Sequence, residues 1–386
     1  MNHNKPLPTG NQTTNLLIDY LTRRSRQHFR GAASIIVHGS AARNEYTVYS
    51  EQEQDILPGN IGLLIITDSP IRDRLIYGSF LRFLRNIDSS DFTQSISRRL
   101  ILVKPFEISL IPRTILIKGR ISPDIWVFEM VKANRVVYGE DLLSLFNTKF
   151  GLDAGIKMTI ARLFGLSLCL PLIIRADFGD KLKTLAINYE SVKGILGAFE
   201  ALLTLLGKYP PSYSERASLA REVAEAFADD LGDPKGTAML FKQASQFKLN
   251  PQGLETVPIV EFWFKARELL ADCLKIYNSR GYTTDGYLAE QRVHSPIISR
   301  IKEFTRFTTQ GRFEPRALLM SDVEKTAVRL MVQSLFSIDD GYYEKPSGET
   351  ERLLADCRYA NYLHTRGEWH EITDHIKIIK PVKPAS

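Results

Sequence analysis

A glycine and a serine follow a short apolar segment near the N-terminus, an order typical of phosphate-binding turns. Residues 33–37 predict a buried strand, His38 is expected to be a partly buried strand residue with a local hydrogen bond, and Gly39-Ser40 follows. A turn from a strand into a helix presents backbone N–H groups to an anion, and glycine lets a phosphate approach closely. The same pair is common in ordinary turns. Gly39 and Ser40 are therefore candidate phosphate ligands, with a structural turn as the alternative.

Candidate carboxylates lie further along the chain. Glu107 lies within "FEISLI", which predicts a strand, while Glu51, Glu53 and Asp55 lie in "YSEQEQDILPGN". Carboxylates two residues apart on a strand face the same side, and such oxygen ligands suit Mg²⁺. However, the intervening glutamines break the apolar alternation, and a Pro-Gly pair separates these acids from the next strand. A solvated loop is therefore the stronger prediction for this segment.

The elements that must position these residues alternate between helix and strand patterns over the first part of the chain. The expected helices cover residues 16–29 and 71–84, and the expected strands cover residues 33–37, 61–67, 100–103, 106–111 and 136–138. Short strands interleaved with helices predict a small mixed sheet. The fold class is accordingly α/β, of the α+β kind.

Long helical patterns replace the strands after residue 143. Apolar residues recur at helical spacing over 192–206, Gly207 is expected to end that helix, and further helices are expected at 215–231 and 262–277. Later helices are expected at 297–307 and 321–336, and a strand at 376–382. The predicted organisation is a polar tail at 1–14, an α/β domain at 15–145, a helical bundle at 146–285, and a C-terminal helical region with an extended tail at 286–386.

Composition indicates a globular protein with a mildly basic surface. The chain has 386 residues, a net charge of +6 and a pI near 9.0, which favours an anionic partner such as RNA. The clearest basic cluster is Arg23, Arg24, Arg26 and Arg30, for which a solvated helix face is the alternative. The longest apolar run, 164–174, is too short to cross a bilayer. The polar N-terminal segment and three scattered cysteines predict a cytoplasmic location.

The motifs together resemble the nucleotidyltransferase fold of the DNA polymerase β superfamily, in its minimal or aminoglycoside-modifying branch with a helical C-terminal domain. The resemblance rests on "VHGSAARNE", "IGLLIIT", "FEISLIP" and "RVVYGEDLL" and covers about residues 15–145. It implies that Gly39, Ser40 and Arg43 bind the phosphates of a nucleoside triphosphate and that Glu107 is the third catalytic carboxylate. It also implies two Mg²⁺ ions that clamp the attacking and leaving oxygens.

The sequence departs from this family at the two metal-binding carboxylates, where the alignment places Asn60 and Gly62. Neither residue supplies an anionic ligand. We therefore expect a catalytically degenerate relative that binds a nucleotide or RNA or acts as a scaffold. One alternative is an active Mg²⁺-dependent enzyme that transfers a nucleotide to a hydroxyl acceptor, with Glu107 and the acids of residues 51–55 as metal ligands. Another is a protein-interaction module of a larger assembly.

Overall fold

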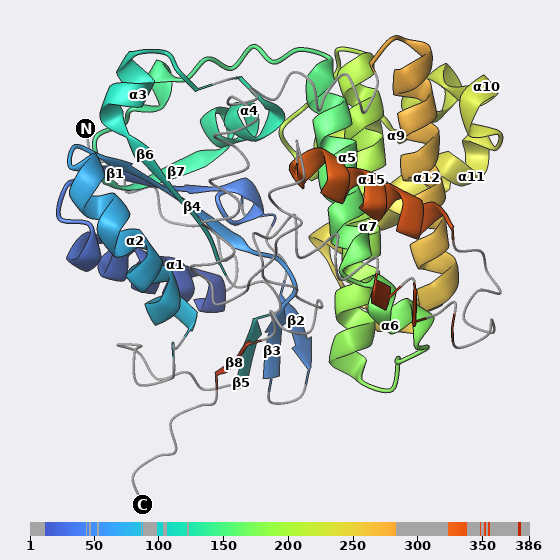
Figure 1. The fold of residues 1–386 in the computed structure, drawn as a ribbon, viewed down its shortest axis with the longest axis horizontal. Coiled ribbons are helices and arrows are strands. Elements are labelled where there is room, and N and C mark those ends of the chain that lie inside the picture. The colour runs from blue at the N-terminus through green and yellow to red at the C-terminus, as the bar shows by residue number, and fades with distance from the viewer. Residues whose placement is uncertain are drawn as a thin grey trace, which may run out of the picture.

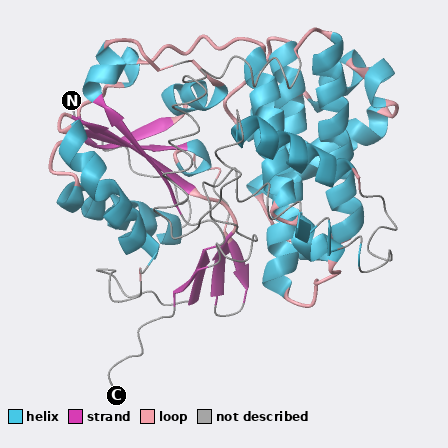
Figure 2. Cartoon of the chain, viewed as in Figure 1, coloured by secondary structure: helices cyan, strands magenta, loops and turns pink. Residues whose placement is uncertain are grey.

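An α/β layer and a helical bundle lie side by side, with a second small sheet near their junction (Figure 1, Figure 2). The computed structural model describes residues 12–43, 45, 48–51, 54–85, 87, 99–102, 106–121, 123–282, 323–337, 348, 351–352, 354–355 and 377–379. The predicted mixed α/β class is confirmed.

The first sheet has the strand order β6-β4-β1-β7. Its strands are β1 (Ala32–His38), β4 (Ile61–Thr67), β6 (Phe106–Pro112) and β7 (Asn134–Gly139). β1 is antiparallel to β4 and β7, whereas β4 is parallel to β6. All seven residues of β4 are buried because helices cover both faces of the sheet. These four strands confirm the expected ones at 33–37, 61–67, 106–111 and 136–138.

Two pairs of helices cover the sheet. α1 (Gln12–His28) and α2 (Pro70–Arg85) pack on one face, around Ile35 and Val37, and α3 (Arg113–Ile117) and α4 (Ile125–Lys132) pack on the other, around Ile36. The alternation of side chains along β1 produces these two cores. The helices expected at 16–29 and 71–84 are confirmed, although α1 begins inside the segment predicted to be a polar tail.

A second four-stranded sheet has the order β2-β3-β5-β8. Its strands are β2 (Tyr49–Glu51), β3 (Gln54–Leu57), β5 (Arg99–Leu102) and β8 (Lys377–Ile379). The prediction of a solvated loop over residues 51–55 is wrong, since β2 and β3 pair as antiparallel strands. Ile56 packs into the bundle core and Leu57 into the α1 core, and this burial offsets the polar residues before them. β8 confirms the strand expected within 376–382 and brings the C-terminal region back beside β5.

The bundle is organised around α7 (Lys181–Leu205), which is buried along most of its length. Its other helices are α5 (Asp153–Ser167), α6 (Leu170–Ile174), α8 (Tyr213–Ser218), α9 (Ala220–Ala226), α10 (Ala228–Leu231), α11 (Pro234–Leu249), α12 (Ile259–Ser279) and α15 (Val323–Phe336). Gly207 follows α7 with φ +66°, as its predicted role in ending the helix requires. The single helix expected at 215–231 is instead three short helices, and the helix expected at 297–307 lies outside the described residues.

Candidate functional site

A cavity of about 390 Å³ lies where the sheet, α4 and the bundle meet. The ends of β1, β4 and β6 form one wall, α4 forms a second, and α5, α7, α8 and α11 form the third. Gly39, Ser40, Arg43, Asn60 and Glu107, which are far apart in the sequence, all line this cleft. The structure therefore brings together the phosphate-turn and third-carboxylate residues that the resemblance selected.

The turn at Gly39 leads into a very short helix. A single turn of 3₁₀ helix, η1 (Gly39–Ala41), follows β1, and Gly39 has φ +76°. Such a conformation favours glycine. A turn of three residues has little macrodipole, so any anion held at Gly39-Ser40 would depend on local N–H groups and on charges from elsewhere in the cleft.

Strand register places Asn60 and Gly62, which the resemblance aligns with metal-binding carboxylates, beside Glu107. Gly62 is the register partner of Glu107 on β6 and of His38 on β1. Immediately before β4, Asn60 Nδ2 donates a hydrogen bond to the Glu107 carboxylate. A neutral amide thus contacts the one predicted catalytic acid that the cleft retains.

His38 occupies the space in which a side chain at position 62 would begin. A Cβ atom on Gly62 would lie 2.4 Å from His38 Cε1 and 2.7 Å from Nδ1. His38 Nε2 is buried and has no hydrogen-bond partner in the part of the chain that the structure describes, so the expected local hydrogen bond is absent for this atom. Burial lowers the pKa of His38, against the raising effects of Glu107 and Glu129, and this favours the neutral ring.

The acids of residues 51–55 do not complete a metal site in the described structure. Asp55 is buried on β3 and accepts a hydrogen bond of 3.0 Å from Thr13 Oγ1, and it does not line the cleft. Glu53 lies outside the described residues, and only the backbone of Glu51 is described, in β2. Among the described residues, no group of three or more His, Cys, Asp or Glu side chains can hold a metal ion. The described donors therefore do not fit a pair of Mg²⁺ ions.

The bundle contributes cations to the cleft that the sequence analysis missed. Lys157 and Arg162 project from α5, Lys193 from α7 and Lys248 from α11. Ion pairs join Lys157 to Asp153 at 2.6 Å and Lys193 to Glu190 at 3.1 Å. The available sequence signal was Lys193 beside the mostly apolar residues 194–203 of α7, but the direction of its side chain depends on how the bundle packs.

Lys248 is the most deeply placed of these cations. Its Nζ donates a hydrogen bond to the Tyr189 hydroxyl and lies 5.5 Å from the centre of the Tyr213 ring. Burial lowers the pKa of Lys248, and the positive charges of Arg162 and Arg43 lower it further. An anion in the cleft would oppose both effects, because it would stabilise the protonated amine.

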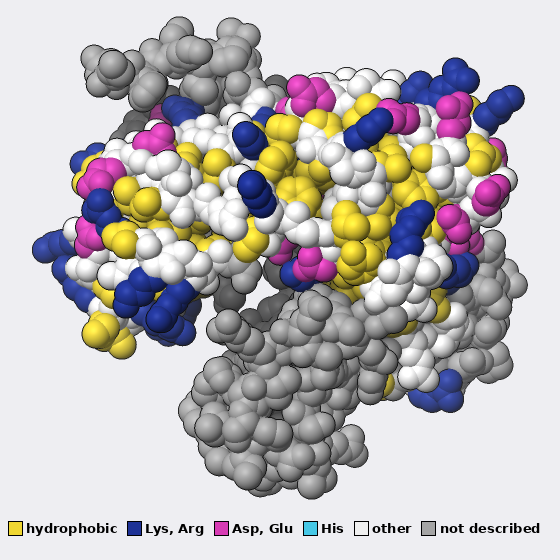
Figure 3. Space-filling model, turned by 90° about the horizontal axis from the view of Figure 1, so that it is seen from above, with side chains coloured by type: hydrophobic (Ala, Val, Ile, Leu, Met, Phe, Trp, Pro, Cys, Tyr) yellow, Lys and Arg dark blue, Asp and Glu magenta, His cyan; other side chains and the backbone are white. Residues whose placement is uncertain are grey.

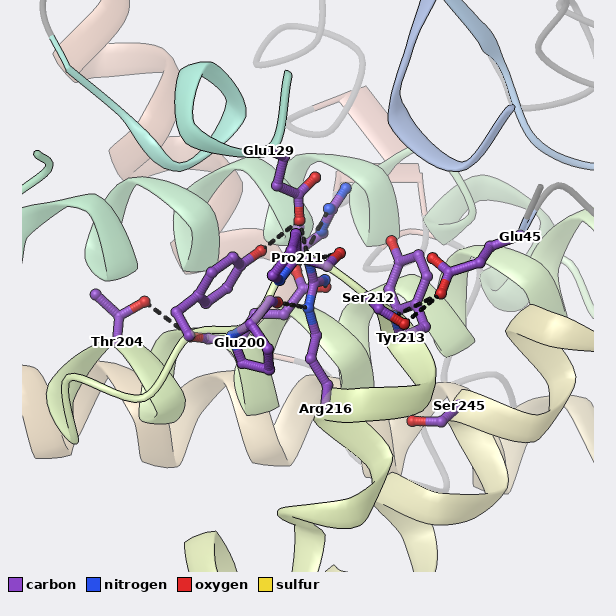
Figure 4. Close-up of polar contacts among 12 residues, drawn as sticks. Glu45, Glu129, Glu200, Thr204, Pro211, Ser212, Tyr213, Arg216 and Ser245 are labelled. Carbon is purple, nitrogen blue, oxygen red and sulfur yellow. Dashed lines mark hydrogen bonds and ion pairs between the residues drawn. The ribbon is translucent and has the colours of Figure 1, made fainter. Parts of the chain in front are cut away.

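A buried ion network fixes the walls of the cleft relative to one another. Figure 4 shows Arg216 of α8 reaching toward Glu129 of α4 and Glu200 of α7, and its guanidinium pairs with both carboxylates. Arg216 Nη2 also donates to the Pro211 carbonyl at 2.8 Å. Burial raises the pKa of Glu129, but the charges of Arg216 and Arg43 outweigh it and hold that pKa at about 2. The network therefore ties the sheet layer to the bundle through charged groups.

Arg43 belongs to this network. Its guanidinium pairs with Glu45 at 2.6 Å and with Glu129 at 3.5 Å, and it lies 5.1 Å from the Tyr213 ring centre. Glu45 in turn accepts hydrogen bonds from the Ser212 hydroxyl and the Tyr213 amide (Figure 4). Two carboxylates already compensate the charge of Arg43, so its geometry supports a positioning role more than direct phosphate binding.

None of the described helices combines the length and hydropathy needed to cross a membrane. Searches of protein-family models, curated proteins and solved structures found no match to this chain.

Proposed function

We propose that the chain is a catalytically degenerate nucleotidyltransferase-like protein that binds a nucleoside triphosphate in the cleft without two-metal chemistry. The observation that carries the proposal is that two walls of different chemistry face each other across the cleft. One wall has the Gly39-Ser40 turn with neutral Asn60 and Gly62, and the other has the bundle cations. In the nucleotidyltransferases that the sequence resembles, metal ions supply positive charge to the triphosphate. Here that charge would come from lysine and arginine side chains.

The size and chemistry of the cleft support a nucleotide as its ligand. A volume of about 390 Å³ lies within the range of roughly 300–1,000 Å³ typical of small-molecule sites. Among the described residues, five lysine or arginine side chains and three carboxylates line it: Arg43, Lys157, Arg162, Lys193, Lys248, Asp124, Glu107 and Glu129. Trp126 lines the cleft with 40% of its surface exposed and offers an aromatic face to a base.

The same geometry argues against ordinary nucleotidyl transfer. A two-metal mechanism needs several carboxylates that converge on the attacking and leaving oxygens. In the cleft, Glu107 accepts a hydrogen bond from the Asn60 amide, and Glu129 forms ion pairs with Arg216 and Arg43. The retained acids therefore lack the arrangement that would hold two ions.

Calorimetry tests the proposal directly. ATP, GTP, CTP and UTP would be titrated into the protein in Mg²⁺ and, separately, in EDTA, while nucleotide turnover is followed by chromatography. We expect at least one triphosphate to bind in EDTA, and no release of pyrophosphate in Mg²⁺. Binding that requires Mg²⁺ and is accompanied by turnover would support the active-enzyme alternative, and the absence of any binding would favour an interaction module.

A charge-removing variant assigns the binding to the cleft. Lys193→Gln removes a cation but keeps a side chain that can hydrogen-bond to Glu190, and we expect it to weaken triphosphate binding by about tenfold, since a charge-assisted hydrogen bond is worth roughly 1.5–3 kcal/mol. Lys265→Gln is the matched control, because Lys265 also pairs with a glutamate on its own helix but lies outside the cleft. If the two variants bind the triphosphate with equal affinity, the triphosphate does not bind in the cleft.

A further inference from the structure

A second basic pocket lies on the sheet layer, away from the cleft. It has a volume of about 410 Å³ between the end of α1 and β7. Its lining residues are Arg23, Arg26, Gln27, Phe29, Arg30 and Tyr138. No carboxylate is among them, in contrast to the cleft, where acids face the cations. Figure 3 shows Lys and Arg side chains gathered at the end of the molecule that holds the sheet layer.

Two arginines of this pocket have no acidic partner among the described residues. Arg26 and Arg30 are exposed, and neither forms an ion pair with any carboxylate of the described residues. The Arg26 guanidinium instead lies 4.3 Å from the centre of the Tyr138 ring. This cation–π contact orients the guanidinium plane while leaving its charge uncompensated. Helix α1 ends here, and the weak negative charge of its C-terminus offsets only part of the positive charge of Arg26 and Arg30.

The spacing of the arginines favours a ligand with more than one phosphate. Arg23 and Arg26 lie about one helical turn apart, and Arg30 follows in the turn after α1. From Arg23 to Arg30 the chain advances by roughly 10 Å at about 1.5 Å per residue. Guanidinium groups carried over that length of chain can contact successive phosphates of a strand, which offers more acceptors to three arginines than a single phosphate does.

We infer that this pocket binds single-stranded nucleic acid. The three arginines contact successive backbone phosphates, and a base stacks on the face of the Arg26 guanidinium that is turned away from Tyr138. The site is separate from the cleft along β1, since Tyr138 is the register partner of Ile35 whereas Asn134 is the partner of His38. Nucleic-acid binding at this pocket can therefore be tested separately from nucleotide binding in the cleft.

Fluorescence anisotropy with labelled oligouridylate and oligothymidylate of about 20 nucleotides tests the inference, since sites on single strands cover roughly 4–16 nucleotides. The test variant is R26A/R30A. The control is K235A/K242A, which removes two exposed charges from α11 and so lowers the overall charge equally. We expect R26A/R30A to weaken binding at least tenfold and to reduce the salt slope of log Kd by about 1.4, because each phosphate contact contributes about 0.7. The control should bind within about twofold of the unmodified protein.

Other outcomes would overturn the inference. If neither oligonucleotide binds, the pocket is not a nucleic-acid site. If both double variants weaken binding equally, the interaction reflects net charge alone and the inference is likewise wrong. A phosphoserine peptide that binds more tightly than the oligonucleotides and is lost in R26A/R30A would assign the pocket to a phosphoprotein instead. Circular dichroism of each variant confirms that the fold is unchanged.

Discussion

At the scale of single residues, position 62 limits the chemistry that the cleft can support. Gly62 lies next to Glu107 in the sheet, where a second carboxylate would share a metal with it, yet the His38 ring occupies the space of its Cβ atom. An acid at this position would therefore require His38 to move as well. While His38 keeps its place, the packing of β1, β4 and β6 leaves no room for a second carboxylate beside Glu107.

Glu129 is the residue whose removal should disturb the cleft most. Glu129→Gln leaves the fully buried Arg216 with one carboxylate fewer, and breaking a buried ion pair costs about 3–5 kcal/mol. We expect a loss of that size in the free energy of unfolding, measured by urea denaturation at neutral pH. Glu225→Gln, which breaks the exposed pair with Arg221, is the control and should change stability by less than about 0.5 kcal/mol.

The lowered pKa of Glu129 predicts how the stability difference between the unmodified protein and Glu129→Gln depends on pH. The pKa of Glu129 is about 2 in the folded state, below its ordinary value of 4.5. The carboxylate therefore stabilises the fold fully at pH values above 4.5, and this stabilisation is lost as the pH falls toward 2. The difference in stability between the unmodified protein and Glu129→Gln should therefore narrow below about pH 4.5. A difference that stays constant down to pH 3 would contradict the assigned ion network.

At the scale of elements, α7 and the helices against it hold the cationic wall in place. Gly155 of α5 lies so close to α12 that a Cβ atom would stand 1.7 Å from Tyr277 Oη, whose hydroxyl donates to the Ala201 carbonyl of α7 at 2.9 Å. The close contact of three helices therefore depends on the absence of a side chain at one position.

Two glycine substitutions should have opposite effects on stability. Gly155→Ala should lower the free energy of unfolding by about 1–3 kcal/mol, because the added methyl displaces Tyr277 from a packed core. Gly78→Ala is the matched change in an exposed part of α2, where nothing lies within 4 Å of the new Cβ atom, and it should stabilise by up to about 1 kcal/mol through helix propensity. Thermal and urea unfolding would measure both. Equal effects would show that α5 and α12 are less closely packed than described.

Elements with local signals were predictable, and those formed by distant segments were not. β4 and the second half of α7 were evident from an apolar run and a helical period, whereas the first turns of α7 were not predicted. The hairpin of β2 and β3 was missed because Ile56 and Leu57 face two different cores, so neither a simple alternation nor a polar face marks the strand. The meeting of Gly39-Ser40 with Glu107 was predicted from the family resemblance. The lysines that face them were not, since their direction is set by tertiary packing.

At the scale of the whole molecule, the cleft belongs to neither the sheet layer nor the bundle alone. The sheet supplies the Gly39-Ser40 turn and Glu107, and the bundle supplies Arg162, Lys193 and Lys248. The Arg216 network joins the two halves through α4 and α8. A ligand held between these walls would contact both halves, so the arrangement of the two parts determines the ligand as much as any single motif does.

A structure of the protein with ATP bound in the presence of EDTA tests the central claim most directly. We predict triphosphate density between Gly39-Ser40 and the side chains of Arg162, Lys193 and Lys248, with the Asn60 to Glu107 hydrogen bond kept. A second crystal grown with Mn²⁺ should show no pair of metal peaks at Glu107. Two metal ions bridging Glu107 and the phosphates, or a triphosphate bound outside the cleft, would contradict the proposal.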